Sequence, residues 1–183
     1  MTRIVAGEYG GRRIQTPPGD GTRPTTDRVR EAMFSSLQSE LGGFDGLRVL
    51  DLFAGSGALG LEAMSRGATS ADFVESDARV AGLIKRNIAD LGCSGAGVLR
   101  TTVERFLRVP PSMAYDLVFL DPPYALPTDG VSALVATLSV PAWRTPDSVI
   151  VVERSTRDPF AWPEGVEPLK DKAYGETHLW YGR

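Results

Sequence analysis

Short apolar segments alternate with segments of helical periodicity between residues 47 and 153, and this alternation restricts the fold more than any other feature. Strands are expected at 47–53, 71–75, 98–101, 115–120 and 148–153, and helices at 57–66, 78–91, 103–108 and 131–138. Such an order is typical of an α/β fold, in which helices cover both faces of a mostly parallel sheet. Two further segments, 167–173 and 177–181, flank a Tyr-Gly-Glu turn and predict a closing antiparallel hairpin.

The beginning of the chain has a different character. Several glycines separate two short extended segments, 3–6 and 12–16, and this pattern predicts a β-hairpin. A Pro-Thr-Thr-Asp segment then begins an amphipathic helix, which a pair of glycines ends near residue 42. We therefore expect two parts: an N-terminal arm of hairpin and helix, residues 1–43, and a main domain, residues 44–183.

Charge is distributed unevenly along the chain. The net charge of the 183 residues is −3, yet the first 30 residues carry six arginines against three acidic residues, a local charge of +3. The remaining residues therefore sum to −6. A basic arm on an acidic body can bind phosphate groups locally, although charge alone is explained more simply by a solvated, arginine-rich surface.

Composition excludes several classes of protein. With one cysteine, Cys93, and one histidine, His178, neither a disulfide nor a metal site built from these residues is expected, and both side chains are interpreted as structural. The apolar runs are too short to span a membrane, and the first residues lack the apolar stretch of a secretory signal. We expect a cytoplasmic protein that holds no metal.

The first chemical signal is the glycine-rich segment DLFAGSGALG at 51–60. It follows an expected strand and opens an expected helix, where glycines let a ligand approach the backbone and free N–H groups are available. Glu75 ends the next strand, 20 residues after Gly55, which is the position of a ribose-binding acid in nucleotide-binding sheets.

Two cofactors compete for this segment. The glycines fit the pattern of nicotinamide-dinucleotide sites, but a carboxylate at the strand end, Asp51, would repel a pyrophosphate. The same carboxylate suits the cationic methionine end of S-adenosylmethionine, which is therefore favoured. The residues expected to bind the methionine end and the ribose of this cofactor are Asp51, Ala54, Gly55, Gly57, Glu75 and Ser76.

The second signal, Asp121-Pro122-Pro123-Tyr124, follows an apolar strand and should meet the glycine-rich loop at one edge of the sheet. Alone it could be a rigid turn. Its residue types nevertheless suit the methylation of an exocyclic amino group, a poor nucleophile. Asp121 and the Pro122 carbonyl can each accept one amino hydrogen and stabilise the positive charge that develops on the nitrogen. Pro122 and Pro123 stiffen the turn, and Tyr124 offers a face on which an extruded base can stack.

Together these two segments resemble the class I amino-methyltransferases. The N-terminal residues narrow the resemblance, because RIVAG at 3–7, GRR at 11–13 and TRPTTDRVREAMF at 22–34 are similar to the RsmD family, the bacterial 16S ribosomal RNA guanine-N2 methyltransferases. The segment YGET at 174–177 is similar to the closing hairpin of that family. The resemblance spans nearly the whole chain.

The resemblance implies a Rossmann-like, doubly wound, seven-stranded sheet and S-adenosylmethionine as the methyl donor. It implies that the substrate is a guanine N2 of 16S rRNA, on a small-subunit assembly particle rather than on naked RNA, and we expect a monomer. Thr102 and Val103 are placed near the adenine, where this fold commonly has Asp or Asn. The arginines expected to contact RNA are Arg3, Arg12, Arg13, Arg23 and Arg28.

Three other functions remain open. An adenine-N6 methyltransferase acting on DNA or RNA shares the Asp-Pro-Pro-Tyr segment, but usually carries a larger target-recognition domain. A nicotinamide-dependent oxidoreductase would explain the glycines but neither Asp51 nor this segment. A non-catalytic RNA-binding assembly factor could retain the fold, although the intact segment argues against it.

Overall fold

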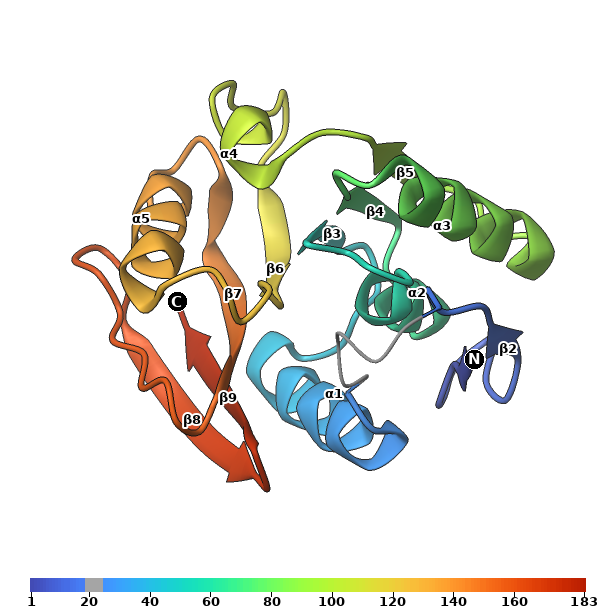
Figure 1. Ribbon diagram of the computed structural model, residues 1–183, viewed down its shortest axis with the longest axis horizontal. Coiled ribbons are helices and arrows are strands. Elements are labelled where there is room, and N and C mark those ends of the chain that lie inside the picture. Colours follow the sequence, from blue (N-terminus) through green and yellow to red (C-terminus); the bar gives the residue numbers. More distant parts are fainter. Residues whose placement is uncertain (19–24) are drawn as a thin grey trace.

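A computed structural model describes residues 1–18 and 25–183, and its main feature is a seven-stranded sheet with the strand order β5-β4-β3-β6-β7-β9-β8 (Figure 1). The strands are β3 (Arg48–Leu52), β4 (Ser70–Val74), β5 (Ala96–Leu99), β6 (Tyr115–Leu120), β7 (Arg144–Ser155), β8 (Pro168–Tyr174) and β9 (Thr177–Gly182). The first five pair in parallel, and β9 runs antiparallel between β7 and β8. The predicted doubly wound α/β fold with its closing hairpin is confirmed.

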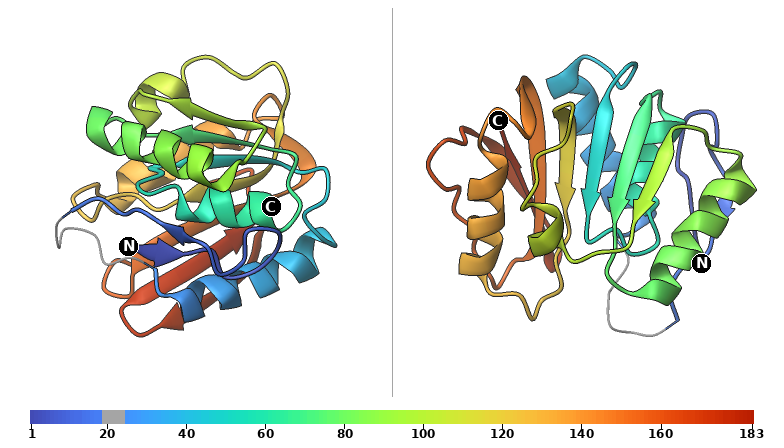
Figure 2. Two further views of the ribbon diagram at one scale, coloured as in Figure 1. Left: turned by 90° about the vertical axis from the view of Figure 1, so that its right-hand side faces the viewer. Right: turned by 90° about the horizontal axis from the view of Figure 1, so that it is seen from above.

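Helices cover both faces of this sheet because alternate strand residues enter two separate cores. Val49, Phe119 and Val151 belong to the core on one face, and their neighbours Leu50, Val118 and Ile150 to the core on the other. The first core is closed by α1 (Asp27–Leu41), α2 (Ala58–Ser65) and α3 (Ala78–Leu91), and the second by α4 (Val103–Phe106) and α5 (Thr128–Leu138). The closing hairpin and β5 lie at opposite edges of the sheet (Figure 2, right).

Local sequence explains most of the element boundaries. Helix α1 begins where predicted, because the Thr26 hydroxyl accepts the Val29 N–H at 3.3 Å, and it ends at Gly42, whose φ of 72° is left-handed. Helix α5 begins at residue 128 rather than 131, directly after Pro127, whose fixed φ suits a helix start. Strand β5 ends at residue 99 rather than 101, which leaves Thr102 free to cap α4.

The N-terminal arm packs directly on the sheet region. Its hairpin strands, β1 (Thr2–Arg3) and β2 (Arg13–Ile14), are shorter than predicted. Ile4 and Ile14 are nevertheless fully buried in the same core as residues of α1 and α2. The predicted boundary at residue 43 therefore separates two parts that share one hydrophobic core. Among the helices of residues 25–183, none is long and apolar enough to cross a membrane.

Candidate active site

Both predicted signals lie at the carboxyl ends of adjacent strands. Asp51 is on β3, and Asp121 follows directly after β6, which pairs with β3 in parallel. Glu75 follows directly after β4, the neighbour of β3 on its other side. The sheet therefore brings three acidic side chains and the glycine-rich loop to one edge.

The glycine-rich loop is shaped by close packing behind it and open space in front of it. A Cβ atom on Gly60 would lie 2.4 Å from the Phe73 ring and 3.2 Å from an oxygen of Asp51, so only glycine fits there. This close approach lets the Gly60 N–H donate to Asp51 at 2.9 Å. At Gly55 the nearest atom to a Cβ would be 4.0 Å away, so its backbone is open to a ligand.

Asp51 is a buried carboxyl without a cationic partner among its described contacts. Burial, and then the negative charge of Glu75, raise its pKa to about 7, while the Gly60 N–H opposes the shift. The side chain is only 2% exposed. A cationic ligand group that enters beside Asp51 would therefore favour its ionised form and be bound by it.

Replacing Asp51 by asparagine should stabilise the free protein increasingly as pH rises. The unfolded carboxyl titrates near ~4 and the folded one near 7, so the natural protein loses stability between these values. Asparagine does not titrate and can still accept the Gly60 N–H. The stability advantage of Asp51→Asn should grow by about 2 kcal/mol between about pH 5.5 and pH 8. Denaturant unfolding at both pH values measures this difference in stability. A stability advantage that is independent of pH would show that the pKa of Asp51 is not raised in the folded protein.

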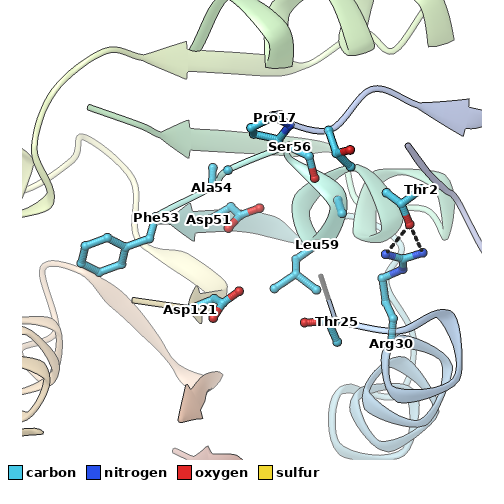
Figure 3. Close-up of a pocket in the computed structure, with 13 residues that line it drawn as sticks. Thr2, Pro17, Thr25, Arg30, Asp51, Phe53, Ala54, Ser56, Leu59 and Asp121 are labelled. Carbon is cyan, nitrogen blue, oxygen red and sulfur yellow. Dashed lines mark hydrogen bonds between the residues drawn. The ribbon is translucent and has the colours of Figure 1, made fainter. Parts of the chain in front are cut away.

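Two cavities flank the loop, and Phe53, Gly55 and Asp121 line both of them. The first, of about 210 Å³, lies between the loop and the N-terminal segment, and in Figure 3 Asp51 and Asp121 point into it from neighbouring strands. The second, of about 360 Å³, follows the ends of β4 and β5. A ligand with two ends can therefore pass over Gly55 from one cavity to the other.

Most predicted cofactor residues line these cavities. Asp51, Ala54 and Gly55 line the first, and Gly55, Glu75, Ser76, Thr102 and Val103 line the second. Gly57 lines neither, because it is buried at the start of α2, with a positive φ of 80°. Its contribution is to the shape of the loop. One oxygen of Glu75 accepts the Gly55 N–H at 3.1 Å, and the other accepts the Asp77 N–H at 2.9 Å.

The Asp-Pro-Pro-Tyr segment leads into a tight turn at residues 123–126, in which the Leu126 N–H donates to the Pro123 carbonyl at 2.9 Å. Pro122 is buried, Pro123 lines the second cavity, and the Tyr124 side chain is 57% exposed. The pKa of Asp121 is raised first by desolvation of its carboxyl and then by the negative charges of Glu153 and Asp51. The positive charge of Arg154 lowers this pKa and so opposes the shift. Asp121 nevertheless remains accessible to solvent.

Several lining residues were not foreseen. The first cavity is also lined by Thr2, Thr16, Pro17, Thr25, Arg30 and Ser56, mostly from the N-terminal segment. The expected arm is thus also a wall of the site, which no local pattern reveals. Phe53 has a positive φ of 60°, an uncommon conformation for a bulky residue, and it lines both cavities.

The predicted RNA-contacting arginines differ in their surroundings. Arg3 and Arg13 face each other across the hairpin, and Arg3 forms an ion pair with Asp27 at 2.7 Å. Arg13 and Arg28 are exposed. The guanidinium of Arg12 instead donates to the carbonyls of Asp90 and Leu91 at the C-terminus of α3, so it anchors the hairpin. Arg23 lies outside the described residues.

The parallel sheet, the glycine-rich loop at its edge and the Asp-Pro-Pro-Tyr turn beside it define the fold of the class I methyltransferases. Residues 2–183 match the sequence family described as conserved hypothetical protein 95, and the chain belongs to this family. In residues 1–18 and 25–183, no three His, Cys, Asp or Glu side chains are arranged to hold a metal ion.

Named relatives extend this assignment. Ribosomal RNA small subunit methyltransferase D of Haemophilus influenzae is 37% identical, over 94% of this chain and 89% of the relative. The solved structure of the methyltransferase candidate yhhF from Escherichia coli is 30% identical, with a TM-score of 0.86 and coverage of 99% of this chain and 96% of that one. Magnesium protoporphyrin IX methyltransferase of Synechocystis, solved with bound SAM, is 15% identical, with a TM-score of 0.62 and coverage of 90% and 86%, a likeness of fold alone.

Proposed function

We propose that this protein transfers a methyl group from S-adenosylmethionine to the exocyclic N2 of a guanine in 16S ribosomal RNA. The observation that carries the proposal is the meeting of Asp51 and Asp121 in one cavity, at the ends of adjacent strands and beside an open glycine loop. Family membership and the name of the Haemophilus influenzae relative support the choice of substrate.

The residues at the site fit S-adenosylmethionine. Asp51 suits the ammonium of the methionine end, and Glu75 has carboxylate lone pairs left for the ribose hydroxyls, because each oxygen accepts one N–H. Thr102 and Val103 line the second cavity, where the adenine would lie. A pyrophosphate would instead face Asp51, Glu75 and Asp121, and this disfavours a nicotinamide dinucleotide. When bound, S-adenosylmethionine supplies an electrophilic methyl group attached to a positively charged sulfur.

The Asp-Pro-Pro-Tyr turn is proposed to hold and polarise the acceptor. Asp121 accepts one hydrogen of the amino group and the Pro122 carbonyl accepts the other, so both stabilise the positive charge that develops on nitrogen. The exposed ring of Tyr124 provides a surface on which an extruded guanine can stack, a contact worth ~1–3 kcal/mol. Pro123 helps to fix the turn.

The proposed substrate particle is an assembling small ribosomal subunit, with the enzyme acting as a monomer in the cytoplasm. This is tested by labelled methyl transfer to protein-free 16S rRNA and to small subunits from cells that lack the enzyme. We expect incorporation into the subunits, and calorimetric binding of S-adenosylmethionine but not of a nicotinamide dinucleotide. Binding of the dinucleotide alone, or no incorporation into either RNA, would contradict the proposal.

The exposed arginines Arg3, Arg13 and Arg28 are proposed to grip RNA phosphates without reading sequence. Replacing Arg13 and Arg28 together by alanine should weaken RNA binding. The slope of log affinity against log salt should fall by roughly 1.4, at ~0.7 for each phosphate contact. Arg12 is a weaker candidate because its guanidinium already binds the end of α3.

Binding titrations at several salt concentrations measure this slope. A double substitution of Lys85 and Arg86 by alanine removes the same charge from the exposed face of α3 and serves as the control. Equal slopes for the two double variants would show that the hairpin and the start of α1 do not grip RNA.

A further inference from the structure

A third carboxylate, Glu153, lies at the same edge of the sheet. Leu120 of β6 pairs with Val152 of β7, so Asp121 and Glu153 each come one residue later on neighbouring strands. Side chains alternate along a strand, and Asp51, Asp121 and Glu153 each come two residues after a member of the same core: Val49, Phe119 and Val151. The three carboxylates therefore lie on one face of the sheet: Asp121 and Glu153 are side by side, and Asp51 is two residues further back, level with Phe119.

Glu153 is held in place by hydroxyl groups. The Thr25 hydroxyl donates to its Oε2 atom at 2.8 Å, and the Thr177 hydroxyl, from β9, also donates to it. Glu153 is only 8% exposed, and Thr25 lines the first cavity together with Asp121. Both partners are neutral, so they orient the carboxylate of Glu153 without cancelling its charge.

The pKa of Asp121 is raised first by desolvation and then by the negative charges of Glu153 and Asp51 on the same face. Arg154, on β7, projects to the opposite face, where it donates to the Leu126 carbonyl at 3.1 Å. Asp51 approaches from β3 and the phenol of Tyr181 from β9, while Arg30 of α1 lines the same cavity. Burial raises the pKa of Glu153 as well. Asp121 and Glu153 lie on neighbouring strand ends, so ionisation of one of them disfavours ionisation of the other.

We propose that Glu153 is a positioning residue that acts through Asp121, keeping this carboxylate basic enough to take the proton that the methylated nitrogen must lose. The inference rests on the proposed function. The amino nitrogen bonds to the methyl carbon as the carbon–sulfur bond breaks, so the positive charge passes from sulfur to nitrogen. The nitrogen then releases one proton to Asp121, and the base becomes neutral again.

Replacing Glu153 by glutamine tests this idea, because the side-chain carbonyl can still accept the Thr25 hydroxyl. In single-turnover methyl transfer at saturating cofactor, the acid limb of the rate against pH should move to lower pH by about one unit, since a neighbouring negative charge is removed. Glu164→Gln, the same change at an exposed residue that lines neither cavity beside the glycine loop, should leave the limb in place. A rate lowered equally at every pH would mean that Glu153 is only structural.

A second measurement does not depend on RNA. Carbon-13 NMR of the Asp121 carboxyl in the free protein should show it titrating at lower pH in the Glu153→Gln variant than in the natural protein. Glu153→Asp keeps the negative charge, so in this variant the Asp121 carboxyl should titrate at the higher pH of the natural protein. An unshifted Asp121 titration in the glutamine variant overturns the inference, whereas failure of the natural protein to methylate RNA would overturn the proposed function instead.

Discussion

Asp121→Ala should lower the rate of methyl transfer by a factor on the order of 10² or more. The substitution removes a hydrogen-bond acceptor from the reacting amino group, but it leaves the glycine loop and its bonds to Asp51 and Glu75 intact. Cofactor binding should therefore survive. Single-turnover transfer and calorimetric titration with S-adenosylmethionine separate the two effects.

A control for this variant is available nearby. Asp129 is an exposed acid in the first turn of α5 and lines neither cavity beside the glycine loop, so Asp129→Ala makes the same chemical change outside the site. It should transfer methyl groups at the natural rate. Near-normal transfer by Asp121→Ala would remove this residue from the mechanism.

Glu62→Ala should destabilise the fold by ~3–5 kcal/mol. Glu62 is fully buried on α2, where its carboxylate accepts the N–H groups of Val5 at 2.7 Å and Ala6 at 3.0 Å and pairs with Arg66 at 2.8 Å. The buried guanidinium of Arg30 lies 3.6 Å away. Alanine would leave both amide groups without their acceptor and would take one of two carboxylates from Arg30, which keeps its ion pair with Asp27 at 2.9 Å. Among the described hydrogen bonds, the hairpin would then be attached to α2 through Ser65 alone, which accepts the Glu8 and Tyr9 N–H groups.

Denaturant unfolding measures the loss, and hydrogen exchange at residues 5 and 6 reports whether the hairpin detaches first. Glu31 also pairs with Arg66, at 2.7 Å, but is half exposed, so Glu31→Ala should cost at most ~1 kcal/mol. Should Glu62→Ala be too unstable to purify, Glu62→Gln keeps one acceptor oxygen and should lose less. Equal stabilities of the Glu31 and Glu62 variants would contradict the assigned role of this carboxylate.

The sequence was sufficient to predict the sheet and the meeting of the glycine-rich loop with the Asp-Pro-Pro-Tyr segment at one of its edges. Strands buried on both faces have continuous apolar runs, so β3 and β6 were identifiable without any knowledge of their partners. Ligands bind at the carboxyl ends of parallel strands, and this rule predicted that Asp51 and Asp121 lie close together although 70 positions separate them.

Contacts between distant segments were not predictable in the same way. Arg12 looked like a phosphate ligand, but its guanidinium binds carbonyls 78 and 79 positions later in the chain. Glu62 falls within the predicted helix 57–66, and its carboxylate joins α2 to amide groups 56 and 57 positions away. No periodicity marks either residue, because each role depends on how the N-terminal hairpin packs against α2 and α3.

The identity of the methylated nucleoside distinguishes guanine-N2 methylation from adenine-N6 methylation and from the absence of activity. Small-subunit RNA is labelled with methyl groups by the natural protein, digested to nucleosides and separated by chromatography, with the Asp121→Ala variant as the control. We expect the label in N2-methylguanosine, and little of it with the variant. Label in N6-methyladenosine, or none in any nucleoside, would contradict the proposed function.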